Sequence, residues 1–363
     1  MSIMTTAQAL LRADLHDFDG YRSARSTEAL GEIWLNANES PTTAANDADD
    51  LLRRYPEPQP QALREAMAAL YGVQVPQVLA TRGSDEGIDL LLRAFCVPGK
   101  GAIVIAPPVF GMYAVCARLH GAHVLAVPAQ DGEAGWRSDL GAMGQAALRG
   151  GARLVFVCNP GNPSGEAIPA DAIERLACRL RGKALLVVDG AYAEFADSDD
   201  GMALLAGNEN LVLLRTLSKA HALAGARIGC VLAAAELIDM LKRCQAPYPL
   251  AQPAVAAALA ALTPQALARA RNAVVQVRSE RQRLLAALRQ SPGVRRVYSS
   301  QGNFLLLRCD DAQVTFAALL AAGVVVRDMR ATPGLEDALR ISIGTVQQNE
   351  RVLAVLARSR VTT

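Results

Sequence analysis

The middle of the chain alternates short, continuous apolar runs with segments whose apolar residues recur every three or four positions. The runs fall at 78–80, 102–106, 123–127, 153–158, 184–188, 211–214 and 227–232. Strands that are buried on both faces give continuous runs of this kind, and the spacing in 88–95 and 173–180 is that of amphipathic helices. The pattern therefore predicts an α/β fold with a mostly parallel central sheet flanked by helices.

Both ends of the chain differ from this pattern. Residues 1–35 have the pattern of a short arm, and a loop with three prolines then precedes a helix predicted around 61–70. The stretch 253–290 is rich in Ala, Leu and Arg, which predicts a long helix that Pro264 opens or interrupts.

Beyond this helix, strand-like runs alternate again with helical segments. We expect strands at 303–308, 324–327 and 339–343, and helices at about 312–322 and 347–359. A smaller α+β unit therefore follows the large one, with a boundary near 245–255. The expected organisation is an N-terminal arm over 1–45, a large domain over 46–250 and a small domain over 251–363.

Composition narrows the class of protein. The 363 residues carry 37 basic and 35 acidic side chains, so nothing favours a nucleic-acid or membrane partner. No apolar stretch is long enough to span a bilayer, and the segment from Met1 to Asp14 lacks a signal-peptide pattern. The seven cysteines are spread without a CxxC pair, which is typical of reduced core residues, and the four histidines lack metal-ligand spacing. We therefore expect a cytoplasmic protein without a metal.

The run 211–214 leads into the most informative segment of the chain. Lys219 follows it, with the hydroxyl residues Thr216 and Ser218 before the lysine and Arg227 eight positions after it. A lysine amine can form a Schiff base with an aldehyde, and hydroxyl and guanidinium groups can hold a phosphate. Pyridoxal phosphate (PLP) combines an aldehyde with a phosphate, so the segment predicts a PLP site.

Three further residues have the chemistry that such a site needs. Asp189 ends the run 184–188, at the strand end where α/β sheets bind ligands, and can pair with the pyridine nitrogen; alternatively it caps the next segment. Asn162 and Tyr192 can hydrogen-bond the ring oxygen. The alternative interpretations are a simple turn for Asn162 and core packing for Tyr192.

Two segments nearer the N-terminus complete the prediction. Ser84 is the expected N-cap of a helix, and the free backbone N–H groups of Ser84 and Asp85 would suit a phosphate. Phe110, after the run 102–106, offers an aromatic face for the ring or is a core aromatic. His221 is a second candidate base, although the lysine itself normally carries the proton in this chemistry.

In this order, these residues resemble the fold-type I PLP-dependent aminotransferases, and the resemblance extends over nearly the whole chain. The family's general motifs are Asn162-Pro163-Ser164-Gly165, Asp189-x-x-Tyr192, Thr216-x-Ser218-Lys219 and Arg227. More specific matches are Tyr21-Arg22-Ser23-Ala24-Arg25, Trp34 to Glu39, Arg54-Tyr55-Pro56, Gly83 to Glu86 and Leu339 to Gly344.

The resemblance implies a role for each cofactor-binding residue. Lys219 is the Schiff-base lysine, Asp189 the partner of the pyridine nitrogen, and Phe110 the residue stacked on the ring. Asn162 and Tyr192 hold the ring oxygen. The phosphate is held by Ser84, Asp85, Thr216, Ser218 and Arg227.

The resemblance also implies a homodimer with shared sites and a particular reaction. Tyr55 would reach the phosphate of the partner subunit's cofactor. Arg340 would bind the substrate anion with help from Arg327 and Tyr21, and Asn38 would also contact the substrate. A guanidinium fork suits both a carboxylate and a phosphate. The implied reaction is transamination between histidinol phosphate and 2-oxoglutarate, which gives imidazole-acetol phosphate and glutamate in histidine biosynthesis.

Three positions depart from the family pattern and leave the substrate range open. Gly190 stands where glutamate is common, His221 where phenylalanine is common, and Phe110 where tyrosine is usual. The alternatives are an aromatic or broad-specificity aminotransferase and a PLP-dependent decarboxylase of a substrate such as threonine phosphate. A ligand-sensing regulator would need a basic DNA-binding module, for which the chain has neither the length nor the charge.

Overall fold

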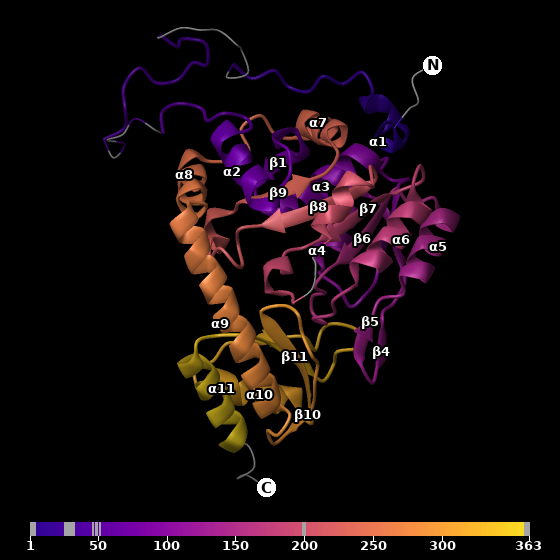
Figure 1. The fold of residues 1–363 in the computed structure, drawn as a ribbon, viewed down its shortest axis with the longest axis vertical. Helices are drawn as coiled ribbons and strands as arrows, with labels where there is room; N and C mark the ends of the chain where they lie inside the picture. Colours follow the sequence, from indigo (N-terminus) through magenta and orange to yellow (C-terminus); the bar gives the residue numbers. More distant parts are fainter. Residues whose placement is uncertain are drawn as a thin grey trace.

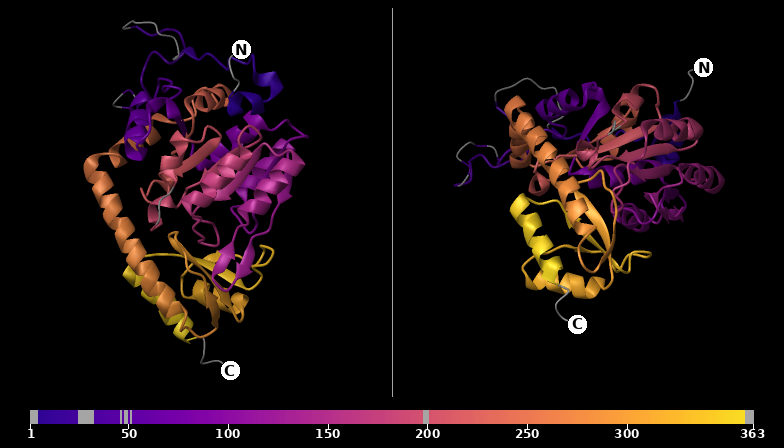
Figure 2. Two further views of the ribbon diagram at one scale, coloured as in Figure 1. Left: turned by 45° about the vertical axis from the view of Figure 1, so that its right-hand side comes forward. Right: turned by 60° about the horizontal axis from the view of Figure 1, so that its bottom comes forward.

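A computed structural model of the protein describes residues 5–24, 33–45, 47, 50, 52–197 and 201–358. Two sheets form its two parts, a large one with helices on both faces and a small one built from the C-terminal third (Figure 1). The helix α9 (Pro264–Leu288) extends from the large part to the small one, as Figure 2 shows from two further sides. Within the described ranges, no helix is long and apolar enough to cross a membrane.

The large sheet has seven strands in the described part of the chain. Their spatial order is β1 (Val78–Thr81), β9 (Gly229–Leu232), β8 (Leu211–Thr216), β7 (Leu185–Asp189), β6 (Leu154–Cys158), β2 (Ala102–Ile105) and β3 (His123–Ala126). All neighbours are parallel except β9, which is antiparallel to both β8 and β1. The predicted mostly parallel sheet is confirmed. The expectation that 123–127 is buried on both faces is wrong, because β3 lies at the sheet edge and is mostly exposed.

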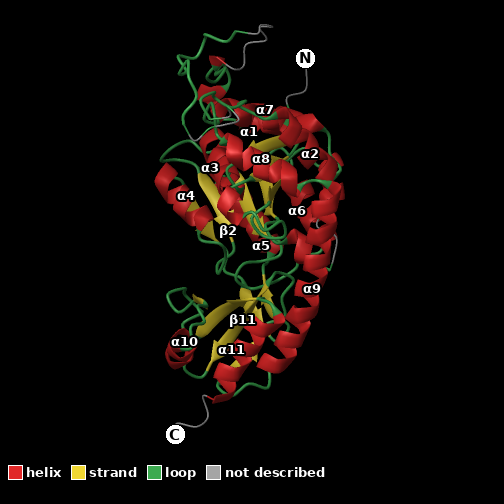
Figure 3. Ribbon diagram, turned by 90° about the vertical axis from the view of Figure 1, so that its left-hand side faces the viewer, coloured by secondary structure: helices red, strands yellow, loops and turns green. Residues whose placement is uncertain are grey.

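Helices cover both faces of this sheet (Figure 3). One face packs against α2 (Gln61–Tyr71), α5 (Leu140–Gly150), α6 (Ala170–Leu180) and α8 (Gln252–Ala261), and the other against α1 (Thr6–Leu10), α3 (Ser84–Phe95), α4 (Met112–His120) and α7 (Ala235–Cys244). Alternate residues of β7 point to opposite sides: Leu186 joins one core and Leu185 the other. This two-sided burial explains the continuous apolar runs. Pro264 is the first residue of α9, so the long predicted helix is divided into α8 and α9.

The small sheet is antiparallel throughout. Its order is β10 (Val294–Val297), β11 (Phe304–Cys309), β13 (Ala338–Ser342) and β12 (Arg327–Asp328), and α10 (Ala312–Ala321), α11 (Val346–Arg358) and the end of α9 pack on it. Leu305, Leu307 and Leu339 are fully buried in this second core. The smaller α+β unit is thus present as predicted. The register pairs Arg327 with Arg340, so two cations are neighbours on adjacent strands.

A short hairpin, β4 (Gln130–Gly132) and β5 (Gly135–Arg137), extends from the large part to the small sheet (Figure 1). Asp131 in this hairpin accepts hydrogen bonds from Arg296 Nη1 at 3.1 Å, Arg308 Nη2 at 3.0 Å and the Tyr298 hydroxyl at 2.5 Å. Trp136 packs against the same cluster. The hairpin is too short and too polar to have a hydrophobic signature, which is why the sequence pattern did not predict it.

The cysteines depart partly from the expectation. All seven thiols are free, and five are buried, but Cys178 is exposed and Cys244 is half-buried. Cys178 lies near the end of α6, on the face of that helix that points away from the sheet.

The hairpin contact makes a testable contribution to stability. Replacing Asp131 with alanine removes an acceptor that three side chains of the small sheet share, and we expect the free energy of unfolding in urea to fall by ~2 kcal/mol. Asp310→Ala is the control, because its carboxylate is 66% exposed and lies 3.6 Å from Arg295. Equal losses in the two variants would contradict this role of Asp131.

Candidate active site

The carboxyl ends of the parallel strands lie at one edge of the large sheet, and the predicted site residues follow them. Asn162 lies after β6, Asp189 is the last residue of β7, and Thr216 the last residue of β8. A cavity of about 140 Å³ opens here, and its lining includes Ser84, Asp85, Phe110, Asn162, Asp189, Tyr192, Thr216, Ser218, Lys219 and Arg227. The fold therefore brings together the residues that the sequence predicted to hold a cofactor within one chain.

Asp189 lines the cavity, and only 2% of the residue is exposed. Its Oδ2 accepts a hydrogen bond from the Tyr113 hydroxyl at 2.7 Å, and its Oδ1 accepts one from the backbone N–H of Ala191 at 3.1 Å. Burial raises the pKa of Asp189, and these two hydrogen bonds oppose the rise. Sequence reasoning missed Tyr113; its position three residues after Phe110, at the start of a helix, was the available signal.

The start of α3, Ser218 and Arg227 give the cavity the donors of an anion site. The helix α3 starts at Ser84, and Gly83 with a φ of 74° is its N-cap, so the prediction that Ser84 is the cap is wrong. A Cβ at Gly83 would lie 2.6 Å from Arg227 Nη2, so the close approach of this arginine requires glycine. Arg227 donates to Ser218 Oγ at 3.2 Å and to Asp85 Oδ2 at 3.1 Å. Unpaired N–H groups of a helix start beside these donors suit a phosphate.

The amine of Lys219, the Tyr192 phenol and the Asn162 amide also line the cavity. Lys219 Nζ is 5.8 Å from the centre of the Tyr192 ring. Burial lowers the pKa of Lys219, and the positive charge of Arg340 lowers it further. Asn162 Nδ2 donates to the Tyr192 hydroxyl at 3.4 Å, and Arg340 Nη1 donates to Asn162 Oδ1. Arg340, from the small sheet, thus reaches the rim of a site built by the large one.

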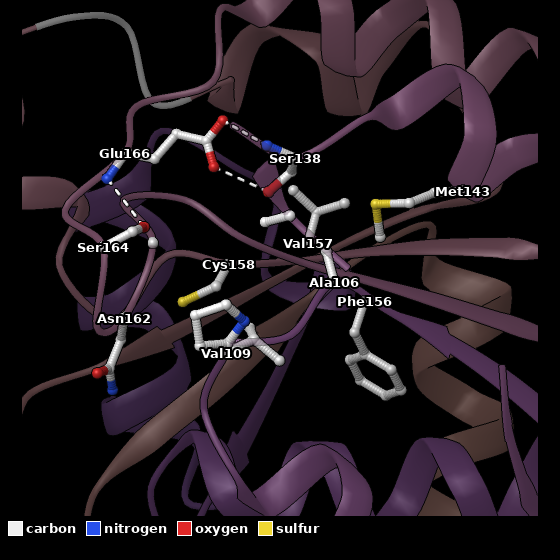
Figure 4. Close-up of a pocket in the computed structure, with 13 residues that line it drawn as sticks. Ala106, Val109, Ser138, Met143, Phe156, Val157, Cys158, Asn162, Ser164 and Glu166 are labelled. Atoms are coloured by element: carbon white, nitrogen blue, oxygen red, sulfur yellow. Dashed lines mark hydrogen bonds between the residues drawn. The ribbon is translucent and has the colours of Figure 1, made fainter. Parts of the chain in front are cut away.

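Hydrogen bonds to Ser138 and within the loop itself hold the loop that carries Asn162 in place (Figure 4). The Glu166 carboxylate accepts hydrogen bonds from the backbone N–H of Ser138 at 2.9 Å and from its hydroxyl at 2.8 Å. The Glu166 N–H donates to Ser164 Oγ at 3.2 Å, and Gly165 N–H donates to the Gly161 carbonyl at 2.7 Å. These bonds hold the loop on both sides of Asn162 in place before any ligand binds.

Four predicted residues lie away from the cavity. Tyr21 lines a separate pocket beside the end of α7, and Asn38 is exposed on the N-terminal arm. Tyr55 is 48% exposed and stacks on Tyr248 with ring centres 4.5 Å apart. Arg327 is exposed beside Arg340 in the register of the small sheet. Of the arm motif that begins at Tyr21, the last residue, Arg25, is outside the described residues.

The structure gives a physical reason for Gly190. A Cβ at this position would lie 1.6 Å from Arg215 Nη1, and Arg215 is a fully buried side chain that is 1% exposed. Because glycine has no side chain, position 190, directly after Asp189, leaves room for the Arg215 guanidinium. His221 does not line the cavity. Burial lowers the pKa of His221, and neither ring nitrogen has a hydrogen-bond partner among the described residues.

Together these groups fit a flat, phosphorylated ring that carries an aldehyde. The cavity is lined by the aromatic face of Phe110, the Asp189 carboxylate, the Asn162 amide with the Tyr192 phenol, and the Lys219 amine. It also includes the anion site formed by the start of α3, Ser218 and Arg227. Each group can contact a different part of such a ring, so the donor set matches PLP.

The fold and the site define a PLP-dependent enzyme of the α/β class. The family model "Aminotransferase class I and II" matches residues 22–356, and the chain belongs to this family. The chain is 59% identical over 352 residues to the histidinol-phosphate aminotransferase of Stenotrophomonas maltophilia (strain R551-3), a match that covers 97% of each chain.

Solved structures are similar over most of the chain. The histidinol-phosphate aminotransferase of Sinorhizobium meliloti in complex with pyridoxal-5'-phosphate matches with a TM-score of 0.76 and 26% identity, over 86% of this chain and 84% of that one. The L-threonine-O-3-phosphate decarboxylase of Porphyromonas gingivalis matches with a TM-score of 0.71 and 23% identity, over 85% and 91%. The fold alone therefore does not separate transamination from decarboxylation.

The contact between Gly190 and Arg215 predicts a strong effect on stability. In Gly190→Ala the new methyl group must displace a buried guanidinium, and we expect the free energy of unfolding to fall by ~2 kcal/mol. Gly207→Ala is the matched control, because nothing lies within 4 Å of a Cβ built there. Urea denaturation of both variants measures the difference. Equal stabilities would show that Arg215 moves aside without cost.

Proposed function

We propose that this protein is a PLP-dependent aminotransferase that transfers the amino group of histidinol phosphate to 2-oxoglutarate in histidine biosynthesis. The proposal rests on one observation. Lys219, Asp189 and the anion site around Arg227 all line one cavity, and Arg340 lies at its rim. The name of the relative that is 59% identical over nearly the full length supports the choice of substrate.

The cofactor residues act on different parts of the bound group. PLP would supply an electrophilic carbon and an electron-accepting ring. Asp189 holds the proton of the ring nitrogen, and Asn162 with Tyr192 contacts the ring oxygen. Lys219 carries a proton to and from the reacting carbon through its Nζ. Its lowered pKa increases the fraction of neutral amine, the form that accepts a proton.

Arg340 is the residue that we assign to the substrate anion. Its guanidinium lies 5.0 Å from the centre of the Phe304 ring, and one nitrogen donates to Asn162. Its Nε is buried and has no hydrogen-bond partner among the described residues. A held guanidinium with a free donor suits either a carboxylate or a phosphate, which is what two substrates that alternate in one site require.

We further propose a homodimer with shared sites in the cytoplasm. The described residues 33–45 of the arm extend away from the body of the molecule (Figure 1), and Ile33 and Leu35 are 82% and 88% exposed. Exposed apolar side chains of this size favour a protein partner. In such a dimer Tyr55, which does not reach the cavity of its own chain, would contact the phosphate in the partner's cavity. Tyr21 would approach the substrate there, whereas Arg327, the register neighbour of Arg340, would assist Arg340 with the substrate anion in the cavity of its own chain.

The two half-reactions test the function. The protein loaded with PLP should lose its visible absorption band when histidinol phosphate is added and recover it with 2-oxoglutarate. Lys219→Ala should lower the rate by more than 10³-fold, because the proton carrier is lost, while the exposed Lys183→Ala should match the parent. A band that responds to phenylalanine or tyrosine but not to histidinol phosphate would favour the broad-specificity enzyme. Carbon dioxide release from threonine phosphate would favour the decarboxylase.

The anion site gives a second prediction. Arg340→Gln removes the charge that both substrates need, so kcat/KM should fall ~100-fold for histidinol phosphate and for glutamate. Steady-state kinetics with each donor measures the two losses. The variant should still bind the cofactor, which the presence of a visible absorption band checks. A loss for one donor only would contradict a common anion site at Arg340.

A further inference from the structure

The hydroxyl of Tyr113, which is not part of the cavity lining, contacts the Asp189 carboxylate. Asp189 lines the cavity, whereas Tyr113 does not line it and is fully buried. The 2.7 Å hydrogen bond joins the phenol to Oδ2, while Ala191 N–H occupies Oδ1. A carboxylate has about four lone-pair sites, so both oxygens keep capacity for a donor inside the cavity.

The Tyr113 ring is held so tightly that its hydroxyl has little choice of direction. It stacks on Phe156 with ring centres 4.8 Å apart and an angle of 14°, and it meets Phe110 edge-on at 5.7 Å. Tyr113 is the second residue of α4, and Phe110 lies just before that helix. The same segment therefore supplies the aromatic wall of the cavity and the second contact of the carboxylate.

A buried carboxylate is unfavourable as an anion unless hydrogen bonds stabilise the charge. Among the influences that lower the pKa of Asp189, the hydrogen bond from Tyr113 is the largest, followed by that from Ala191 N–H and the charge of Arg215. The negative charge of Asp85 acts in the opposite direction. The other ionisable groups nearby are the Cys158 thiol, on the neighbouring strand, and the Tyr192 phenol and Lys219 amine, which line the cavity.

We propose that Tyr113 is a positioning residue that keeps Asp189 ionised and correctly oriented, so that the hold on the cofactor's ring nitrogen depends on this hydroxyl. The proposal rests on the proposed PLP site. Tyr113 acts only through Asp189, since it touches neither the cavity nor any group that reacts.

Tyr113→Phe tests the hydroxyl alone, because phenylalanine keeps the stacking on Phe156. The variant should bind PLP about tenfold more weakly. Without this donor the pKa of Asp189 rises, so the loss of PLP affinity on acidification should begin about one pH unit higher than in the parent. The ¹⁵N resonance of the labelled pyridine nitrogen should show less protonation at neutral pH. Tyr71→Phe, the same exchange at the end of α2, should leave all three unchanged.

A double variant separates positioning from general damage. If Tyr113 acts through Asp189, adding Tyr113→Phe to Asp189→Asn should change PLP affinity by less than about twofold. Full additivity, or an unchanged ¹⁵N profile and acid limb in Tyr113→Phe, would overturn the proposal.

A measurement without cofactor keeps the two proposals distinct. In the cofactor-free protein, the infrared band of protonated Asp189, identified by its absence in Asp189→Asn, should appear at higher pH in Tyr113→Phe than in the parent. A parent protein that binds no PLP would refute the proposed function, but this band would still report on the contact. No shift of the band would refute the role of Tyr113.

Discussion

The buried carboxylate of Asp189 is the constraint on which the rest of the site depends. It lies at the end of the central strand β7, 2% exposed, in a sheet whose two faces are both covered by helices. An anion in such a place needs donors, and the structure supplies them from α4 and from its own following turn. The carboxylate lone pairs that these donors leave free can accept a hydrogen bond inside the cavity, which suits a ligand with a protonated nitrogen.

The rest of the molecule positions other groups around this carboxylate. Parallel strands place Asn162, Asp189 and Lys219 at one edge because their carboxyl ends coincide. The start of α3 adds backbone N–H groups that suit an anion. The hairpin and α9 connect the small sheet to the large part, and from that sheet Arg340 reaches Asn162. The position of Arg340 therefore depends on contacts outside the cavity, such as those of Asp131.

Whether the sequence predicted a feature of this structure depends on how far apart in the chain the interacting residues lie. The runs that became β6, β7 and β8 were visible because burial on both faces leaves a continuous apolar signal, and the residues just after them had to meet. The same pattern predicted that β3 is buried on both faces, which is wrong, because an apolar run does not show whether its strand lies at the edge of a sheet. The hydrogen bond from Tyr113 to Asp189 and the fit of Arg215 against Gly190 were missed because each joins residues that are distant in sequence and that only the packing of the fold brings together. Tyr21, Tyr55 and Arg327 lie away from the cavity of their own chain, so motif reasoning alone does not locate their contacts.

Chemical trapping tests the central claim, that this cavity holds PLP with its aldehyde at Lys219. The chain has three other lysines, Lys100, Lys183 and Lys242. Incubation with stoichiometric PLP, borohydride reduction and peptide mass mapping should find the pyridoxyl label on Lys219 alone, and Asp189→Asn should reduce the labelled fraction. Labelling of the other lysines, or no label under conditions that fix PLP to a known aminotransferase, would contradict the account.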